Sequence, residues 1–213
     1  MKSAKLILRP KIKAVCGISA GVVFLCWFYA FNRPAAVDDG VENRRRLDEL
    51  AAQSPPLGAR SKTADCRVNG PLPDRECTPG SVFPNADKEK ICVDGYTKTV
   101  RNVPVSLKKK IYKAYGITYP PAFGGYELDH LIPLSLGGNN DAANLFPEAA
   151  APPPGFREKD VVENYLRREM CAGNISLDAA QGLIAADWVK VYESLTPEDI
   201  TTLKKQFKSW SEI

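Results

Sequence analysis

The sequence predicts an α+β fold in which two short β-strands and a following helix are separated by loops. Residues 126–133 (YELDHLIP) are apolar and β-prone, as is the shorter run 144–146 (NLF). Between them, residues 137–141 (GGNND) have the composition of a loop. Residues 157–170 are typical of a helix. Because Gly and Pro are concentrated between residues 55 and 154, we expect a loop-rich domain rather than a helical bundle.

The composition is that of a folded chain with room for one domain and additional segments. The chain has 213 residues, of which 25% are charged and 44% hydrophobic. Its formal net charge of +4 permits a polyanionic partner without requiring one. No internal repeat is present.

Residues 14–31 (AVCGISAGVVFLCWFYAF) carry no charge and are just long enough to cross a membrane as a helix. The basic segment 1–13 before them favours a cytoplasmic N-terminus and an exported remainder, although the arginines at 44–46 weaken that orientation. A cleaved signal peptide has the same charge layout. However, aromatic residues stand where a cleavage site needs small ones. We therefore expect a single-pass inner-membrane anchor with a periplasmic C-terminal domain, and secretion is the alternative.

Residues 32–62 read as a linker that contains a short helix at 41–53, because they lack a sustained apolar face. The folded domain is then expected to span residues 63–213. Its first part is a proline-rich loop, followed by a β-hairpin at 90–105 around Asp94-Gly95. This N-terminal hairpin belongs to the predicted fold.

Helices are expected on both sides of the predicted strands. Ser106 begins a helix that runs to residue 115, and Gly116 ends it. Two more helices follow the region 157–170, one at 177–192 and one that Thr196 caps. The many lysines between residues 88 and 113 either hold a phosphate backbone or only keep the surface soluble.

The cysteines support export. Cys16 and Cys26 lie in the apolar segment, and the remaining four fit a disulfide framework in an oxidising compartment. Four cysteines allow three connectivities, of which we expect Cys66–Cys77 and Cys92–Cys171. A zinc site is the alternative, but the sequence has no Cys-x-x-Cys pair.

The feature that points to chemistry is the pair Asp129-His130, which contains the only histidine of the chain. Gly137-Gly138 and Asn144 follow it at short, defined spacings. The simpler interpretation is a β-hairpin whose loop needs glycine and whose surface happens to carry Asp-His. The pattern of residues 126–170 nevertheless resembles the ββα-metal finger of HNH endonucleases. Residues 92–101 (CVDGYTKTVR) and a later Cys-containing helix extend the likeness to small exported bacterial proteins with HNH-type domains.

The resemblance implies a metal-dependent endonuclease that hydrolyses phosphodiester bonds with low sequence specificity. It implies that His130 is the general base and that the side-chain or main-chain carbonyl of Asn144 accepts the other ring N–H. Asp129 would bind the metal, together with Asn164 or Asp160 from the helix, and Glu163 competes for that role. These oxygen donors suit Mg²⁺ or Mn²⁺.

The chain departs from the family pattern because it has no histidine left for the helix, where colicin nuclease domains use histidines. We expect nucleic acid as the partner, with DNA favoured over RNA, and membrane attachment through residues 14–31. The alternative function is a non-catalytic, disulfide-braced envelope domain that keeps the fold and binds nucleic acid or a protein.

Overall fold

A computed structural model describes residues 39–53 and 56–206 of the chain. Residues from Gly40 onward belong to one compact unit. The predicted basic segment 1–13 and the predicted anchor 14–31 lie outside the described residues. None of the helices within 39–53 and 56–206 has the length and hydropathy of a membrane span.

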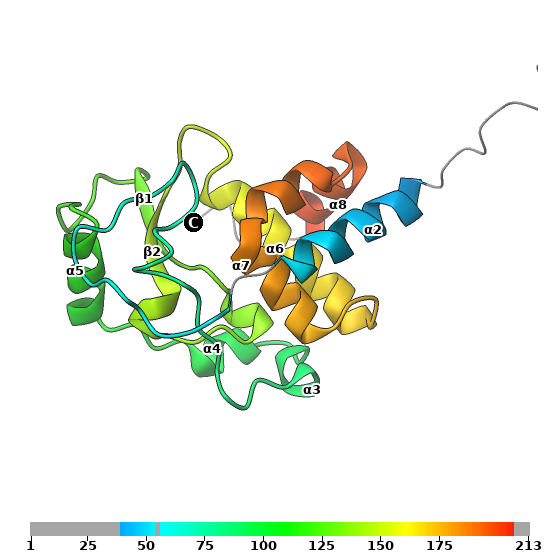
Figure 1. The fold of residues 1–213 in the computed structure, drawn as a ribbon, viewed down its shortest axis with the longest axis horizontal. Helices are drawn as coiled ribbons and strands as arrows, with labels where there is room; N and C mark the ends of the chain where they lie inside the picture. The colour runs from blue at the N-terminus through cyan, green and yellow to red at the C-terminus, as the bar shows by residue number, and fades with distance from the viewer. Residues whose placement is uncertain (1–38, 54–55, 207–213) are drawn as a thin grey trace, which may run out of the picture. The chain divides into compact units, whose positions relative to one another are not determined.

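The described part is α+β, as predicted, and its small sheet lies beside the long C-terminal helices (Figure 1). Two short 3-10 helices, η1 (Leu134–Leu136) and η2 (Ala142–Asn144), lie between the strands. The other elements in chain order are α2 (Asp39–Ala52), α3 (Lys88–Ile91), α4 (Tyr96–Val100), α5 (Val105–Ala114), β1 (Tyr126–His130), β2 (Leu145–Ala149), α6 (Phe156–Ala172), α7 (Leu177–Ser194) and α8 (Pro197–Gln206).

The sheet consists of β1 and β2, which pair antiparallel with His130 opposite Leu145 and Tyr126 opposite Ala149. The predicted second strand ended at residue 146, directly before Pro147, but β2 continues through Pro147 to Ala149. A two-stranded sheet has only edge strands, so a proline that lacks an N–H costs no ladder hydrogen bond when it faces outward. The predicted order of strand, loop, strand and helix is therefore present.

Two apolar clusters flank the end of β1. Leu131 packs with Leu145, Phe146 and Ile111 in the cluster that α5 covers. The next residue, Ile132, packs into a larger cluster with residues of α6 and α7, such as Val162, Leu166, Ile184 and Trp188. Successive residues of an extended segment point to opposite sides, so these two neighbours anchor the end of β1 in both clusters. His130 is thus held at a rigid position.

The predicted hairpin at 90–105 is wrong, because this segment forms the short helices α3 and α4. The Asp87 side chain accepts a hydrogen bond from the Glu89 N–H and caps α3. Gly95 has a φ of 84° and lies directly before α4. The Asp94-Gly95 pair was correctly read as a turn, but the turn joins two helices instead of two strands.

The compact unit begins earlier than the predicted boundary at residue 63. Leu47 of α2 is only 8% exposed and belongs to the larger cluster, against which Leu50 and Leu57 also pack. The predicted helix at 41–53 is therefore present, but much of the expected linker is part of the folded unit. The sequence analysis did not predict that its few apolar residues belong to the core, because they are widely spaced among charged ones.

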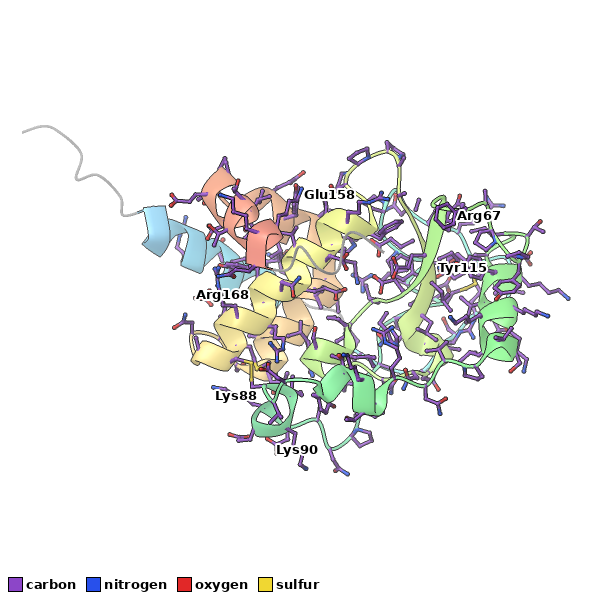
Figure 2. All side chains as sticks on the ribbon, turned by 180° about the vertical axis from the view of Figure 1, so that it is seen from behind. Arg67, Lys88, Lys90, Tyr115, Glu158 and Arg168 are labelled. Carbon is purple, nitrogen blue, oxygen red and sulfur yellow. A yellow bond between two sulfur atoms is a disulfide. The ribbon has the colours of Figure 1, made fainter. Side chains whose placement is uncertain are left out.

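Both predicted disulfides, Cys66–Cys77 and Cys92–Cys171, are present. The first lies in the α5 cluster, and the second joins the end of α3 to α6. Figure 2 shows a sulfur–sulfur bond next to the labelled Lys88 of α3. Two disulfides fit an oxidising compartment of the extracellular type.

The remaining helices follow the prediction with shifted ends. α5 begins at Val105 after Pro104, so Ser106 lies inside it and does not cap it. α7 is broken at Asp187, whose φ of −168° and ψ of 89° are not helical. The Asp187 carboxylate accepts hydrogen bonds from the Val189 and Lys190 N–H groups and restarts the helix. Thr196 caps α8 through the Asp199 N–H, as predicted.

The two disulfides should differ in how much they stabilise the fold. Their sequence separations are 11 and 79 residues. In the chain-entropy model these loops correspond to about 3 and about 4.5 kcal/mol. Cys92→Ser/Cys171→Ser should therefore lower the free energy of unfolding more than Cys66→Ser/Cys77→Ser, as measured by urea unfolding under non-reducing conditions. The reverse order would show that native-state packing outweighs the chain-entropy effect.

Candidate active site around His130

His130 is the last residue of β1 and is only 3% exposed. Its Nε2 lies 3.2 Å from the Asn140 Oδ1. The Asn140 amide is itself oriented, because its Nδ2 donates to the Val100 carbonyl at 2.8 Å and its Oδ1 accepts from the Asn102 N–H at 3.2 Å. The oxygen of Asn140 therefore faces the ring, and an amide oxygen can only accept a hydrogen bond.

This contact determines the tautomer of the neutral imidazole. Because Nε2 must donate to Asn140, the lone pair resides on Nδ1. Nδ1 makes no hydrogen bond within the described part of the chain and is not among its enclosed polar atoms that lack a partner, so it reaches the surface. His130 thus presents one basic nitrogen outward while the other is held from inside.

The surroundings of His130 favour the neutral ring. Burial lowers the pKa of His130 below its usual value, and this effect outweighs the opposing charge of Asp129. Arg101, an exposed residue that follows α4, lies close enough to lower the pKa further. At neutral pH the ring is therefore unprotonated and able to accept a proton.

Asn144, the residue expected to hold the ring, has a different place. It is fully buried, and its Oδ1 accepts from the Ile132 N–H at 2.9 Å. Its Nδ2 donates to the Ile132 and Asn139 carbonyls, each at 2.9 Å. Asn144 therefore ties the two ends of the loop together and supports His130 only indirectly, whereas Asn140 holds the ring.

The two glycines of this loop are required for different reasons. Gly137 has a φ of 77°, a region that favours glycine. At Gly138 a Cβ atom would lie 1.7 Å from the Ile132 carbonyl oxygen, so no side chain fits there. The close approach brings the chain against the atoms that Asn144 also binds, and it gives the Gly-Gly pair a structural role.

A buried lysine that the sequence analysis did not identify, Lys159, contacts the main chain of His130. Lys159 of α6 is 0% exposed. Its Nζ donates to the Asp129 Oδ2 at 2.7 Å, to the His130 carbonyl oxygen at 2.8 Å and to the Glu163 Oε1. Burial would lower the pKa of Lys159, but the charges of Asp129 and Glu163 raise it well above its usual value. The ammonium is therefore charged and fully hydrogen-bonded.

Asp129 is the carboxylate that balances this charge. Burial would raise the pKa of Asp129, but the charge of Lys159 lowers it to about 2. Glu148 is 1% exposed, and its oxygens accept no hydrogen bond from any donor among the described residues. Burial raises the pKa of Glu148 well above its usual value.

Two of the predicted metal ligands are bonded to other groups of the protein. Asp129 is bonded to Lys159, and the Asn164 side chain donates to the Asp160 carbonyl of its own helix at 2.8 Å. Asp160 is exposed, although loss of solvation around its carboxyl and the nearby Asp129 raise its pKa. Within 39–53 and 56–206, no three His, Cys, Asp or Glu side chains are arranged to hold a metal ion. As placed, Asp129 and Asn164 are each bonded to another group of the protein.

The residues that sequence reasoning missed are Asn140, Lys159 and Glu148. Asn140 lies in the predicted loop beside Asn139, and nothing in its spacing distinguishes the two. Lys159 and Glu163 are four residues apart, which places them on one face of a helix and is the one available signal. Lysine is almost never fully buried unless it is paired, so the default reading of this pair is a solvated helix surface.

The chain was compared with protein-family models, with curated proteins and with solved structures, and none of them matches it.

Replacing Asn144 should destabilise the fold. Asn144→Ala leaves the Ile132 N–H and two carbonyls without their buried partners, which we expect to cost about 2 to 4 kcal/mol. Asn164→Ala is the matched control, since that amide bonds only its own helix backbone, and it should change stability by less than about 0.5 kcal/mol. Urea unfolding measures both. Equal losses would contradict the structural role of Asn144.

The single histidine allows a direct test of its protonation. We expect one imidazole signal set in NMR, with the proton on Nε2 and a pKa below about 6.5. Because the folded pKa is lower than the unfolded one, the stability from neutral His130 is fully present above about pH 6.5 and is lost as pH falls through the folded pKa. A pKa above that value, or a proton on Nδ1, would contradict the arrangement with Asn140.

Proposed function

We propose that the chain is an HNH-type nuclease that hydrolyses phosphodiester bonds with His130 as general base. The observation that carries the proposal is the state of His130: a neutral ring, oriented through Nε2 by Asn140, with Nδ1 open to the surface. A buried structural histidine needs no free nitrogen and would have both satisfied. A general base needs an oriented ring with a free lone pair.

In the proposed reaction, Nδ1 of His130 removes a proton from a water molecule. The water oxygen forms a bond to phosphorus as the bond from phosphorus to the leaving oxygen breaks, and the leaving oxygen takes a proton from solvent. Arg101 supplies positive charge beside the ring, since it is exposed and close enough to affect His130. Arg157, at the start of α6, is also exposed and adds positive charge on the side of Glu127 and Asp160.

Low sequence specificity is part of the proposal. The exposed cations of this region, Arg101 and Arg157, suit phosphate oxygens, which carry no base information. The two disulfides favour an exported protein. We retain a membrane anchor at residues 14–31, with the compact unit on the periplasmic side, as part of this proposal.

A second candidate function is a binding domain that keeps the fold and does not cut. Lys159 favours it, because its ammonium engages the carboxylate to which the family resemblance assigns the metal. The state of His130 distinguishes the two candidates. Only the nuclease needs a neutral His130 with a free nitrogen, because only a general base accepts a proton from water.

Cleavage of plasmid DNA and of single-stranded RNA by the purified chain tests the nuclease. His130→Ala should reduce the rate by about 100-fold or more, because general bases contribute factors of that size. Thr201→Ala, an exposed change on α8, should leave the rate unchanged. The wild-type rate should rise with pH through the pKa of His130 and level off by about pH 7.

Cleavage that survives His130→Ala would exclude His130 as the base. If the wild-type chain binds nucleic acid without cutting it, the binding domain is the better account. A rate that still rises above about pH 8 would point to a base with a higher pKa than an imidazole.

A further inference from the structure

We propose that the Lys159 ammonium takes the position that a divalent cation holds in an HNH-type site, so that this chain works without a metal ion at Asp129. The inference rests on the proposed function for its catalytic consequence. The contact between Asp129 and Lys159 of α6 can be tested without any nuclease activity.

The contacts of Lys159 resemble those of a coordinated cation. An ammonium group has three N–H donors. Here they go to three different oxygen atoms: the Asp129 Oδ2 at 2.7 Å, the His130 carbonyl oxygen at 2.8 Å and the Glu163 Oε1. One is a strand side chain, one is a strand carbonyl and one is a helix side chain. Hard divalent cations use the same classes of donor.

The helix places this lysine where the resemblance requires a ligand. Lys159 stands directly before Asp160 and four residues before Glu163, both of which were candidate helix ligands. Its side chain is fully buried and reaches across from α6 to the end of β1. The cation therefore comes from α6 itself, and the helix does not need to offer a carboxylate to a metal.

The cation position at Asp129 already holds a positive charge. The Lys159 ammonium lies 2.7 Å from the Asp129 carboxylate and is also paired with the Glu163 carboxylate. A divalent ion at Asp129 would lie within a few ångströms of the ammonium and be repelled by it.

Lys159 is a positioning residue, because a side chain that is 0% exposed does not touch a substrate. It holds the Asp129 carboxylate and the His130 carbonyl, and through them it fixes the end of β1 that carries the base. The positive charge that meets the phosphate must then come from exposed groups such as Arg101.

The test is Mn²⁺ binding, followed by electron paramagnetic resonance of the free ion and by thermal unfolding. Wild-type protein should show no Mn²⁺ site that Asp129→Asn removes, and its melting temperature should be the same in EDTA and in Mn²⁺. Removing Lys159 leaves the three oxygen atoms around a cavity. Lys159→Ala should therefore melt roughly 10 °C lower in EDTA and recover part of that loss in Mn²⁺.

Two further variants test whether the response to Mn²⁺ arises at Asp129. In Lys159→Ala/Asp129→Asn the response to Mn²⁺ should disappear. Lys90→Ala, which removes an exposed lysine paired with Asp87 at 3.9 Å, should behave as wild type. A Mn²⁺ site in the wild-type protein that depends on Asp129 would overturn the proposal. So would a folded Lys159→Ala that does not respond to Mn²⁺. If Lys159→Ala does not fold in either buffer, the comparison of wild type with Asp129→Asn decides alone.

The catalytic consequence is measured in the nuclease assay. The wild-type rate after chelation should stay within about twofold of the rate in Mg²⁺, while site metals usually change rates by far more. A rate that falls to background in EDTA would overturn the metal-free mechanism. A wild-type chain without any cleavage would instead refute the proposed nuclease, and the Mn²⁺ measurements would still decide the role of Lys159.

Discussion

The structure depends on one buried interaction, the ammonium of Lys159 held by Asp129, the His130 carbonyl and Glu163. It joins the end of β1 to α6 by polar contacts, in addition to the apolar cluster that Ile132 shares with Val162 and Leu166 of α6. Burying a charge is costly, so such a pair contributes little net stability compared with an apolar contact. Its main contribution is to geometry, because three directional hydrogen bonds fix the end of β1 relative to α6. Glu148, whose pKa burial raises well above its usual value, is a further buried carboxyl group close enough to affect Asp129.

A second set of polar contacts holds the loop above this cluster. Asn144 closes the loop from inside, and Asn140 reaches from the loop to the ring of His130. The two asparagines have separate roles: Asn144 maintains the fold, and Asn140 selects the tautomer of His130. The close approach of Gly138 to Ile132 makes the arrangement compact enough for both. The ring of His130 is therefore oriented by Asn140 of the loop, and β1 fixes the position of its main chain.

Much of the fold follows from local patterns in the sequence. The strand at Tyr126–His130, the helix after it, the cap at Thr196 and both disulfides were predicted, because each depends on neighbouring residues or on few alternatives. The hairpin at 90–105 was wrong because β-prone side chains and an Asp-Gly turn do not by themselves distinguish two strands from two short helices. At the site, Asp129 and His130 were found from their spacing. Lys159, Glu148 and Asn140 were missed because their roles arise only from contacts between residues far apart in the chain.

The central claim, that a lysine fills the cation position beneath His130, can be tested most directly by crystallography. Crystals of the wild-type protein would be soaked in Mn²⁺, and the anomalous scattering of the metal would be measured. We expect no anomalous peak between Asp129 and α6, and density for the Lys159 ammonium within hydrogen-bond distance of the Asp129 carboxylate. An anomalous peak at that position, with the Lys159 side chain displaced from Asp129, would contradict the account.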